Sequence, residues 1–294
     1  MSLTISRQKP DKRSVRAARS IRSIVSVVLR YALLIFLAGL FLVPFYLILR
    51  NSLATEQDIR LGVLFPNVLH FENIQELFSD SSTSILVGLQ NSALMAVLGT
   101  IGQVLVTSLA AYAMARIPSR WSTVVFGAVL GTMMIPGAVT FLPTYIVVSY
   151  IGWIGTLQGL IIPSLFSGFT TFLFRQFFLS FPRELEEAGH VDGLGYWGIY
   201  WRIVVPNSLP IFAALGITGL IANWNSFLWP LVNAQNSDSG QTVQVVISTF
   251  ETSQTIILHE LFMAAAIGIL PLILLFLFFQ RYIVQGYTQS GLKG

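Results

Sequence analysis

Cysteine and charge are the two features this sequence has least of. The chain of 294 residues contains no cysteine, which excludes disulfide bonds, thiol catalysis and metal sites built on cysteine. Only 10% of its residues are charged, whereas a soluble globular protein carries about 25%. Because 54% of the residues are hydrophobic and the mean hydropathy is +0.72, intrinsic disorder is excluded as well. The composition therefore predicts a chain that lies in a lipid bilayer.

Six uncharged apolar runs are long enough to cross a hydrocarbon core about 30 Å thick. They cover residues 31–49, 85–115, 121–148, 158–174, 209–232 and 261–280. The first run ends at Arg50 without a small-residue cleavage site, so it is interpreted as an uncleaved anchor and not as a secretory signal. We predict an all-α membrane protein with six transmembrane helices, which places both termini on the same side.

The basic residues favour one side of the predicted membrane. Eight of the 17 lie in the first 30 residues, and only Arg50 and Arg60 fall in segments on the opposite side. Because basic residues are enriched in cytoplasmic segments, this distribution predicts that both termini are cytoplasmic. The basic tail of residues 1–30 is explained by orientation and by attraction to anionic lipid. It is not interpreted as a nucleic-acid-binding arm.

The predicted spans contain no ionisable side chain. Proton-driven carriers usually place such groups in the membrane, so their absence argues against this class, although a sodium site made of carbonyl and hydroxyl oxygens would escape the test. The three lysines, Lys9, Lys12 and Lys293, lack the glycine spacing of a phosphate-binding loop. Any active transport by this chain must therefore draw its energy from a partner.

Neutral polar and aromatic side chains inside the spans could line a path for a hydroxyl-rich solute. The candidates are Asn91 in the second run and Asn223, Trp224, Asn225 and Trp229 in the fifth. Polar side chains in membrane bundles also serve as hydrogen bonds between helices, and the sequence leaves both interpretations open.

The segment from residue 180 to residue 208 has an unusual charge pattern for the side on which it is predicted to lie. It carries four acidic residues, which are Glu184, Glu186, Glu187 and Asp192. Pro182 can start a helix there, and Gly193 can end it. A second amphipathic piece follows and is predicted to stop at Pro206. An acidic helix fits poorly against anionic lipid headgroups, so a docking site for a soluble partner is favoured over a connector lying on the membrane.

Residues 187–193 read EAGHVDG and residues 203–206 read IVVP. This pattern resembles the EAA motif, E-A-A-x-x-D-G followed by I-x-L-P, of permease subunits of binding-protein-dependent ABC importers. The matching residues are Glu187, Ala188, Asp192, Gly193, Ile203 and Pro206, while Gly189 replaces the second alanine and Val205 the leucine.

The resemblance extends over nearly the whole chain. Residues 91–92, 110–116, 134–136 and 174–188 are similar to the carbohydrate-uptake branch of these importers, and residues 280–294 closely resemble the end of the smaller permease of maltose-type transporters. It implies a type I ABC importer permease fold in a bacterial cytoplasmic (inner) membrane. The expected parts are a cytoplasmic tail (1–30), a first transmembrane helix (31–50), an extracytoplasmic loop (51–84), a permease core (85–283) with a coupling helix near 182–193, and a C-terminal tail (284–294).

The same resemblance implies a set of partners. Two ABC ATPase subunits would use ATP and Mg, a second homologous permease would complete the membrane part, and an extracytoplasmic substrate-binding protein would meet the loop at residues 233–258. The coupling helix would dock on an ATPase through Glu187, Ala188 and Gly189, with Asp192 and Gly193 shaping its turn. The C-terminal tail, which ends in Gly291, Leu292, Lys293 and Gly294, would reach the ATPases.

Two other functions remain open from the residues alone. A stand-alone channel or facilitator for a neutral polar solute would explain the uncharged spans but not the acidic helix. A membrane-embedded enzyme has little support, because His70, His190 and His259 lie in loops or at span edges without metal-ligand spacing. We therefore predict no catalytic residue, no metal site and no cofactor bound by this chain. The identity of the sugar is left open.

Overall fold

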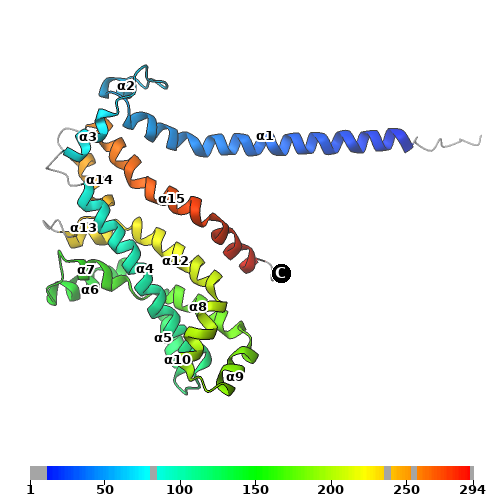
Figure 1. Ribbon diagram of the computed structural model, residues 1–294. Helices are drawn as coiled ribbons and strands as arrows, with labels where there is room; N and C mark the ends of the chain where they lie inside the picture. The colour runs from blue at the N-terminus through cyan, green and yellow to red at the C-terminus, as the bar shows by residue number, and fades with distance from the viewer. Residues whose placement is uncertain (1–11, 80–84, 235–239, 253–256, 292–294) are drawn as a thin grey trace, which may run out of the picture.

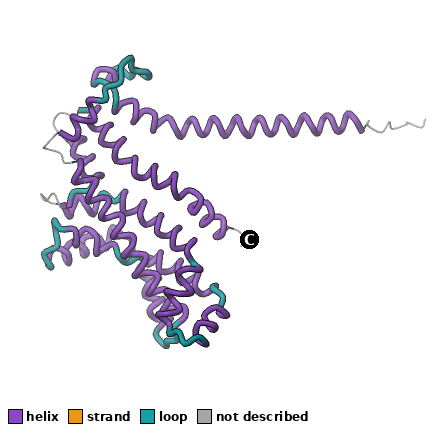
Figure 2. Tube along the Cα trace, in the orientation of Figure 1, coloured by secondary structure: helices purple, strands orange, loops and turns teal. Residues whose placement is uncertain are grey.

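The computed structural model describes residues 12–79, 85–234, 240–252 and 257–291, and the elements in these ranges are all helices (Figure 2). Three of them are long and apolar enough to cross a membrane alone: α1 (Lys12–Ser52), α4 (Ile85–Arg116) and α15 (Leu258–Gly291). They contain the predicted runs 31–49, 85–115 and 261–280. Three further pairs of helices pass the same test as bent pairs, which gives up to six spans in the described residues. The all-α prediction is confirmed.

The predicted run 121–148 is not one helix. It is divided into α5 (Ser122–Met134) and α6 (Gly137–Tyr150), whose axes differ by 104°. The break lies at Pro136, which has no backbone N–H to continue the helix and which favours an extended residue before it. Ile135 adopts that extended backbone, with φ −87° and ψ 118°. The prediction of a single helical span was wrong here.

The run 158–174 is also broken, and its end was placed too early. It forms α7 (Leu157–Ile161), a 3₁₀ turn η1 (Ile162–Ser164) and α8 (Gly168–Ser180), with a bend of 44° between the two parts. Because α8 continues past residue 174, Arg175 is part of the helix. Its guanidinium lies 3.9 Å from the centre of the Phe126 ring, and this cation–π contact favours the cation at that position.

The run 209–232 ends earlier than predicted. α12 (Leu209–Trp224) stops at Asn225, and α13 (Leu228–Ala234) follows. The bent partner of α12 is the preceding piece, which comprises α10 (Tyr196–Ile199), a π-helical turn η2 (Tyr200–Val204) and α11 (Val205–Asn207), at 81° to α12. Pro206 was predicted to stop this piece. It is the second residue of α11, so the piece ends one residue later than predicted, at Asn207.

Shorter helices occupy the two ends of the molecule. The predicted loop 51–84 contains α2 (Glu56–Arg60) and α3 (Glu72–Ser79) at one end, and α9 (Arg183–Val191) lies at the opposite end (Figure 1). α14 (Val243–Thr252) packs against α4 and α15. α15 continues as one helix into the predicted C-terminal tail as far as Gly291.

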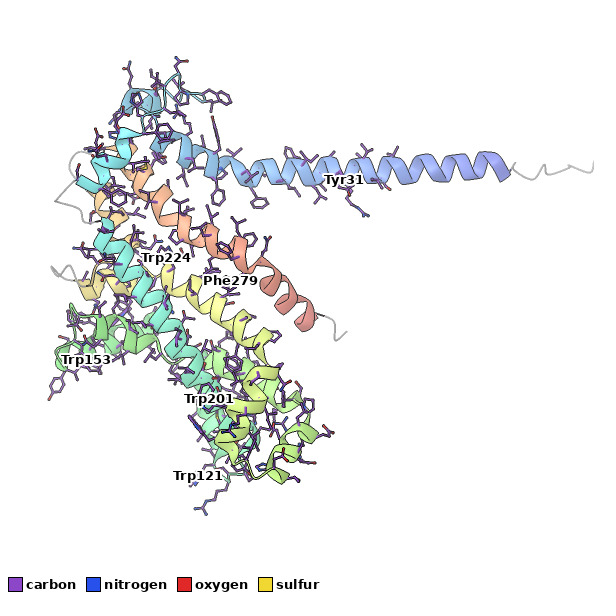
Figure 3. All side chains as sticks on the ribbon, in the orientation of Figure 1. Tyr31, Trp121, Trp153, Trp201, Trp224 and Phe279 are labelled. Atoms are coloured by element: carbon purple, nitrogen blue, oxygen red, sulfur yellow. The ribbon has the colours of Figure 1, made fainter. Side chains whose placement is uncertain are left out.

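The helix α4 is the centre of the fold. It packs on α8, α12 and α14, and a hydrophobic core lies near each of its ends. The first core includes Ile85, Ala96, Trp224, Val246 and Phe250, and the second includes Ala111, Tyr112, Phe174, Phe178 and Tyr200. By contrast, α1 packs on α15 near the α2–α3 end and then projects away from the other helices, with Tyr31 far from the bundle (Figures 1 and 3).

Candidate functional site

The short helix α9 is formed by the local sequence as predicted. Pro182 is its N-cap, and Glu184 and Glu186 lie in its first turn, where the helix dipole favours negative charge. The helix ends at Val191, and Gly193 follows with φ +82°, a left-handed conformation that side chains disfavour. The N–H of Gly193 donates to the carbonyl of His190 at 3.0 Å and completes the turn. The structure thus has a helix within the predicted range 182–193.

One face of α9 is open to its surroundings. The residues on it are Glu184, Glu187, Ala188 and Val191, and Val191 is 88% exposed. Leu185 at the edge of this face is 42% exposed, and Asp192 and Gly193 beyond the helix are exposed too. Apolar side chains among carboxylates at the surface are typical of a place where another protein binds.

The structure places Gly189 on the opposite side of this helix. A Cβ atom at this position would lie 2.6 Å from Cδ1 of Ile203 and 3.2 Å from Cγ1 of Ile199. The small size of Gly189 therefore lets α9 pack closely on α10 and η2. Of the residues predicted to enter a partner's cleft, Glu187 and Ala188 are exposed, whereas Gly189 is covered by the chain itself. Pro206 is exposed but belongs to α11, away from this face of α9.

Glu186 also faces inward, where it meets the end of α4. Its Oε1 lies 3.2 Å from Nε of Arg116, and the side chains are only 11% and 5% exposed. Arg116 also donates from Nη2 to the carbonyl of Phe181, the C-cap of α8. Burial raises the pKa of the Glu186 carboxyl, and the charge of Arg116 opposes this effect. Glu186 is therefore not part of the exposed acidic face of α9.

Three of the residues predicted to line a solute path join helices to one another. Nδ2 of Asn91 donates to the carbonyl of Gln241 at 2.8 Å, and Nδ2 of Asn223 donates to Oγ1 of Thr100 at 3.1 Å. Nε1 of Trp224, labelled in Figure 3, donates to the carbonyl of Gly268 at 3.1 Å. All three side chains are buried, and these contacts correspond to the alternative interpretation as hydrogen bonds between elements.

The other two predicted path residues are more accessible. Asn225 is exposed and donates to the carbonyl of Ile221 in its own helix at 3.0 Å. Trp229 is half-buried, with its ring edge-on to Phe141 and its Nε1 3.1 Å from the carbonyl of Gly159. The five residues thus form a buried group and an accessible group.

Comparison with protein families identifies the chain. Residues 103–289 match the family described as binding-protein-dependent transport system inner membrane component. The chain belongs to this family. The match includes α9, the face that Glu187 and Ala188 present, and the Arg116–Glu186 pair. The permease is therefore a transport subunit of the bacterial inner membrane, and the resemblance drawn from the EAA-like pattern is confirmed.

Curated relatives cover almost the whole permease. It is 31% identical over 264 residues to the lactose transport system permease protein LacG of Rhizobium radiobacter, which covers 90% of this chain and 95% of that one. It is 31% identical to the arabinooligosaccharides transport system permease protein AraQ of Bacillus subtilis, over 91% of this chain and 97% of that one. The sn-glycerol-3-phosphate transport system permease protein UgpE of Yersinia pestis is 34% identical, over 77% of this chain and 83% of that one.

A solved structure shares the fold. A chain in the crystal structure of a bacterial ABC transporter involved in the import of the acidic polysaccharide alginate superposes with a TM-score of 0.78. The alignment covers 94% of this permease and 99% of that chain, at 21% sequence identity. This permease therefore shares its overall fold with a chain of a solved ABC importer.

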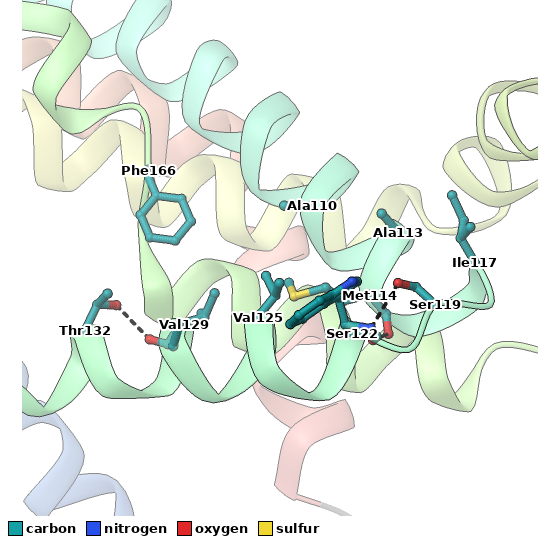
Figure 4. Close-up of a pocket in the computed structure, with 12 residues that line it drawn as sticks. Ala110, Ala113, Met114, Ile117, Ser119, Ser122, Val125, Val129, Thr132 and Phe166 are labelled. Atoms are coloured by element: carbon teal, nitrogen blue, oxygen red, sulfur yellow. Dashed lines mark hydrogen bonds between the residues drawn. The ribbon is translucent and has the colours of Figure 1, made fainter.

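Two hollows flank the turn between α4 and α5 in the permease. A groove of about 560 Å³ is lined by apolar residues such as Ala110, Met114, Val125 and Phe166, with the hydroxyls of Ser122 and Thr132 bonded to backbone carbonyls (Figure 4). A second hollow of about 430 Å³ lies beside α9, where Arg116, Arg183 and Glu186 line it. Of these two hollows, the one beside α9 is lined by charged residues and the other is not.

The contact between Arg116 and Glu186 was not predicted from the sequence. The usable signal was the three-residue spacing of Glu186 and Gly189, which places them on one face opposite Ala188. Of the predicted C-terminal contact residues, Gly291 ends α15, and Leu292, Lys293 and Gly294 lie outside the described residues.

Proposed function

We propose that this permease imports a neutral sugar or oligosaccharide as one subunit of an ATP-driven ABC importer. The observation that carries the proposal is the family match over residues 103–289, which contains the helix α9 with an exposed face around Ala188. The permeases for lactose and for arabinooligosaccharides, each 31% identical to this chain, support a sugar as the solute.

The proposed orientation places α9 and both termini in the cytoplasm. The arginines near the α9 end support it: Arg116 ends α4, Arg120 precedes α5, and Arg183 begins α9. The opposite end carries acidic residues in α2 and α3, among them Glu56, Glu72 and Glu76. Basic residues are enriched on the cytoplasmic side of membrane proteins, so the α9 end is the inner one.

In this orientation α9 is the coupling helix. Its exposed face would dock on one of two ABC ATPase subunits, which bind ATP and Mg, while this chain binds no cofactor. Glu187 and Ala188 are the residues of that face best placed to enter a cleft, because neither is covered by the permease. A second homologous permease would present an equivalent helix to the other ATPase, and the C-terminal tail from Gly291 would extend toward the pair.

The α2–α3 end would meet the sugar-loaded binding protein outside the membrane. Solute released there would enter a path between this permease and its partner. We assign Asn225 and Trp229 to that path, since both are accessible, and Asn91, Asn223 and Trp224 to the walls that shape it. The absence of a lysine or arginine from the described parts of α12 and α13 favours a neutral sugar over an anionic solute such as glycerol phosphate.

A charge reversal at Glu187 tests the docking proposal. We expect Glu187→Lys to lower the ATP hydrolysis stimulated by the loaded binding protein at least about tenfold, which corresponds to about 1.4 kcal/mol. The matched control is Arg120→Glu, which reverses an exposed charge at the same end but outside α9. Purified complexes with equal subunit content would be compared. Equal stimulation in the Glu187 variant and the wild type would contradict docking through this face.

Copurification separates the proposal from a channel that works alone. An importer permease brings down an ATPase and a different permease from the membrane, whereas a facilitator is isolated by itself and conducts solute without ATP.

A further inference from the structure

We propose that the buried ion pair between Arg116 and Glu186 is the joint through which movement of α9 is transmitted to α4. The inference rests on the proposed function, in which an ATPase moves α9. It assigns a role to two residues that the exposed docking face does not include. Arg116 and Glu186 are positioning residues, because they act through α9 and α4.

The contacts of α9 show why this joint differs from its other attachments. Gly189 packs on Ile199 and Ile203, and its carbonyl accepts the N–H of Leu194 at 2.9 Å. These contacts hold α9 to the segment that directly follows it in the chain. The Arg116–Glu186 pair connects α9 to an element about 70 residues earlier, which runs to the other end of the molecule.

Arg116 joins three elements at one point. It ends α4, it lies 3.2 Å from the Glu186 carboxylate of α9, and it donates to the carbonyl of Phe181 at the end of α8. Both charged side chains are nearly removed from solvent. Separating the pair is unfavourable, because the buried Glu186 carboxylate would lose its cation and Arg116, although still bonded to the Phe181 carbonyl, would lose its counter-charge. A displacement of α9 is therefore expected to take the end of α4 with it.

The helix α4 is suited to carry such a displacement. Its 32 residues correspond to a length of about 48 Å at 1.5 Å per residue. Among the three long helices of the described residues, α1 contains Pro44 and α15 contains Pro271, whereas α4 contains no proline. The remaining spans are bent by between 44° and 104°. A straight helix transmits a shift from one end to the other better than a broken one.

The far end of α4 is also fixed by specific hydrogen bonds. Nδ2 of Asn91 donates to the carbonyl of Gln241 at 2.8 Å, and Oγ of Ser92 accepts the N–H of Val243 at 2.8 Å. Gln241 precedes α14, and Val243 is its first residue. α4 thus connects the coupling helix at one end to α14 at the other, with a polar joint at each end.

The first test replaces both charges by apolar side chains of similar size. Exchange of a buried ion pair for well-packed apolar groups is often neutral for stability, so the Arg116→Met/Glu186→Leu complex should assemble. We expect its basal ATP hydrolysis to stay within twofold of wild type. Stimulation by the loaded binding protein, and sugar imported per ATP, should both fall about tenfold. Arg120→Met, at an exposed arginine of the same end, serves as the control.

The second test uses the absence of cysteine from this chain. Arg116→Cys and Glu186→Cys are introduced together, with partner subunits also free of cysteine, and the purified complex is measured before and after a short bifunctional thiol cross-linker. The covalent link replaces the joint in the same protein sample. We expect stimulated ATP hydrolysis to rise several-fold on cross-linking, while a wild-type complex treated with the reagent does not change.

The outcomes distinguish this joint from the proposed function. The joint is contradicted if the assembled apolar variant shows wild-type stimulation of ATP hydrolysis. It is also contradicted if stimulated hydrolysis is equal before and after cross-linking. Neither result contradicts the docking of α9 on an ATPase. A wild-type complex without any stimulated ATP hydrolysis overturns the proposed function, and the joint with it.

Discussion

Single residues of α9 divide between two tasks that their types alone do not separate. Glu186 and Glu187 are adjacent carboxylates, yet Glu187 is exposed and Glu186 is buried against Arg116. The difference follows from the helical period, because neighbouring residues point about 100° apart. The motif match pointed to this segment as a whole, whereas the face that each residue occupies required the positions of α4 and η2.

At the same scale, Gly193 is fixed by its backbone. We predict that Gly193→Val raises the free energy of the folded turn at the end of α9 by about 2 kcal/mol or more, because a β-branched residue is strongly disfavoured at φ +82°. The matched control is Gly195→Val, two residues later, where φ is −77° and nothing lies within 4 Å of an added Cβ.

The measurement for this pair is the amount of ATPase that copurifies with the permease, together with thermal stability. The valine at position 193 should reduce both, and the valine at position 195 should leave both near wild type. If the two variants behave alike, then the left-handed turn is not what shapes the end of α9.

At the scale of elements, the sequence predicted the unbroken spans well and the broken ones poorly. Long uncharged apolar runs account for α1, α4 and α15. The prolines do not show where the other spans break. Pro44 and Pro271 lie inside α1 and α15, whereas Pro136 lies at the break between α5 and α6. Neighbouring helices can satisfy the carbonyl that a proline leaves free, so the outcome depends on packing that the sequence does not state.

The contact between α7 and α13 provides a test of close packing between broken elements. A Cβ on Gly159 would lie 2.1 Å from the carbonyl oxygen of Trp153 and 2.8 Å from Oδ1 of Asn233. We predict that Gly159→Ala destabilises the permease by about 2 kcal/mol or more, because a backbone atom must move. Gly127→Ala in α5 has open space and should be neutral or slightly stabilising, since alanine favours helix.

Thermal unfolding in detergent, read as the midpoint for each variant, checks this pair. A midpoint for Gly159→Ala equal to that of Gly127→Ala would show that α7 does not approach Trp153 and α13 as closely as the structure has it.

The whole molecule has its two hydrophobic cores at opposite ends of α4, with a polar joint beside each of them. Side chains along α1 from Val25 to Tyr46 are exposed to the surroundings of the chain, which in a bilayer are lipid or another membrane subunit. Among the described residues, the charges of α2 and α3 lie at one end, and those of α9 and the end of α4 lie at the other. This arrangement fits a subunit that receives energy at one end and responds at the other.

The central claim is that this permease moves sugar only when a partner ATPase supplies energy. The most direct measurement is uptake of a radiolabelled neutral disaccharide into proteoliposomes that contain the permease, its partner permease and the ATPase, with loaded binding protein outside and ATP inside. We predict accumulation above the external concentration that requires ATP and the binding protein and is lost with Glu187→Lys. Equilibration of the sugar by the permease alone, at the same rate with and without ATP, would contradict the claim.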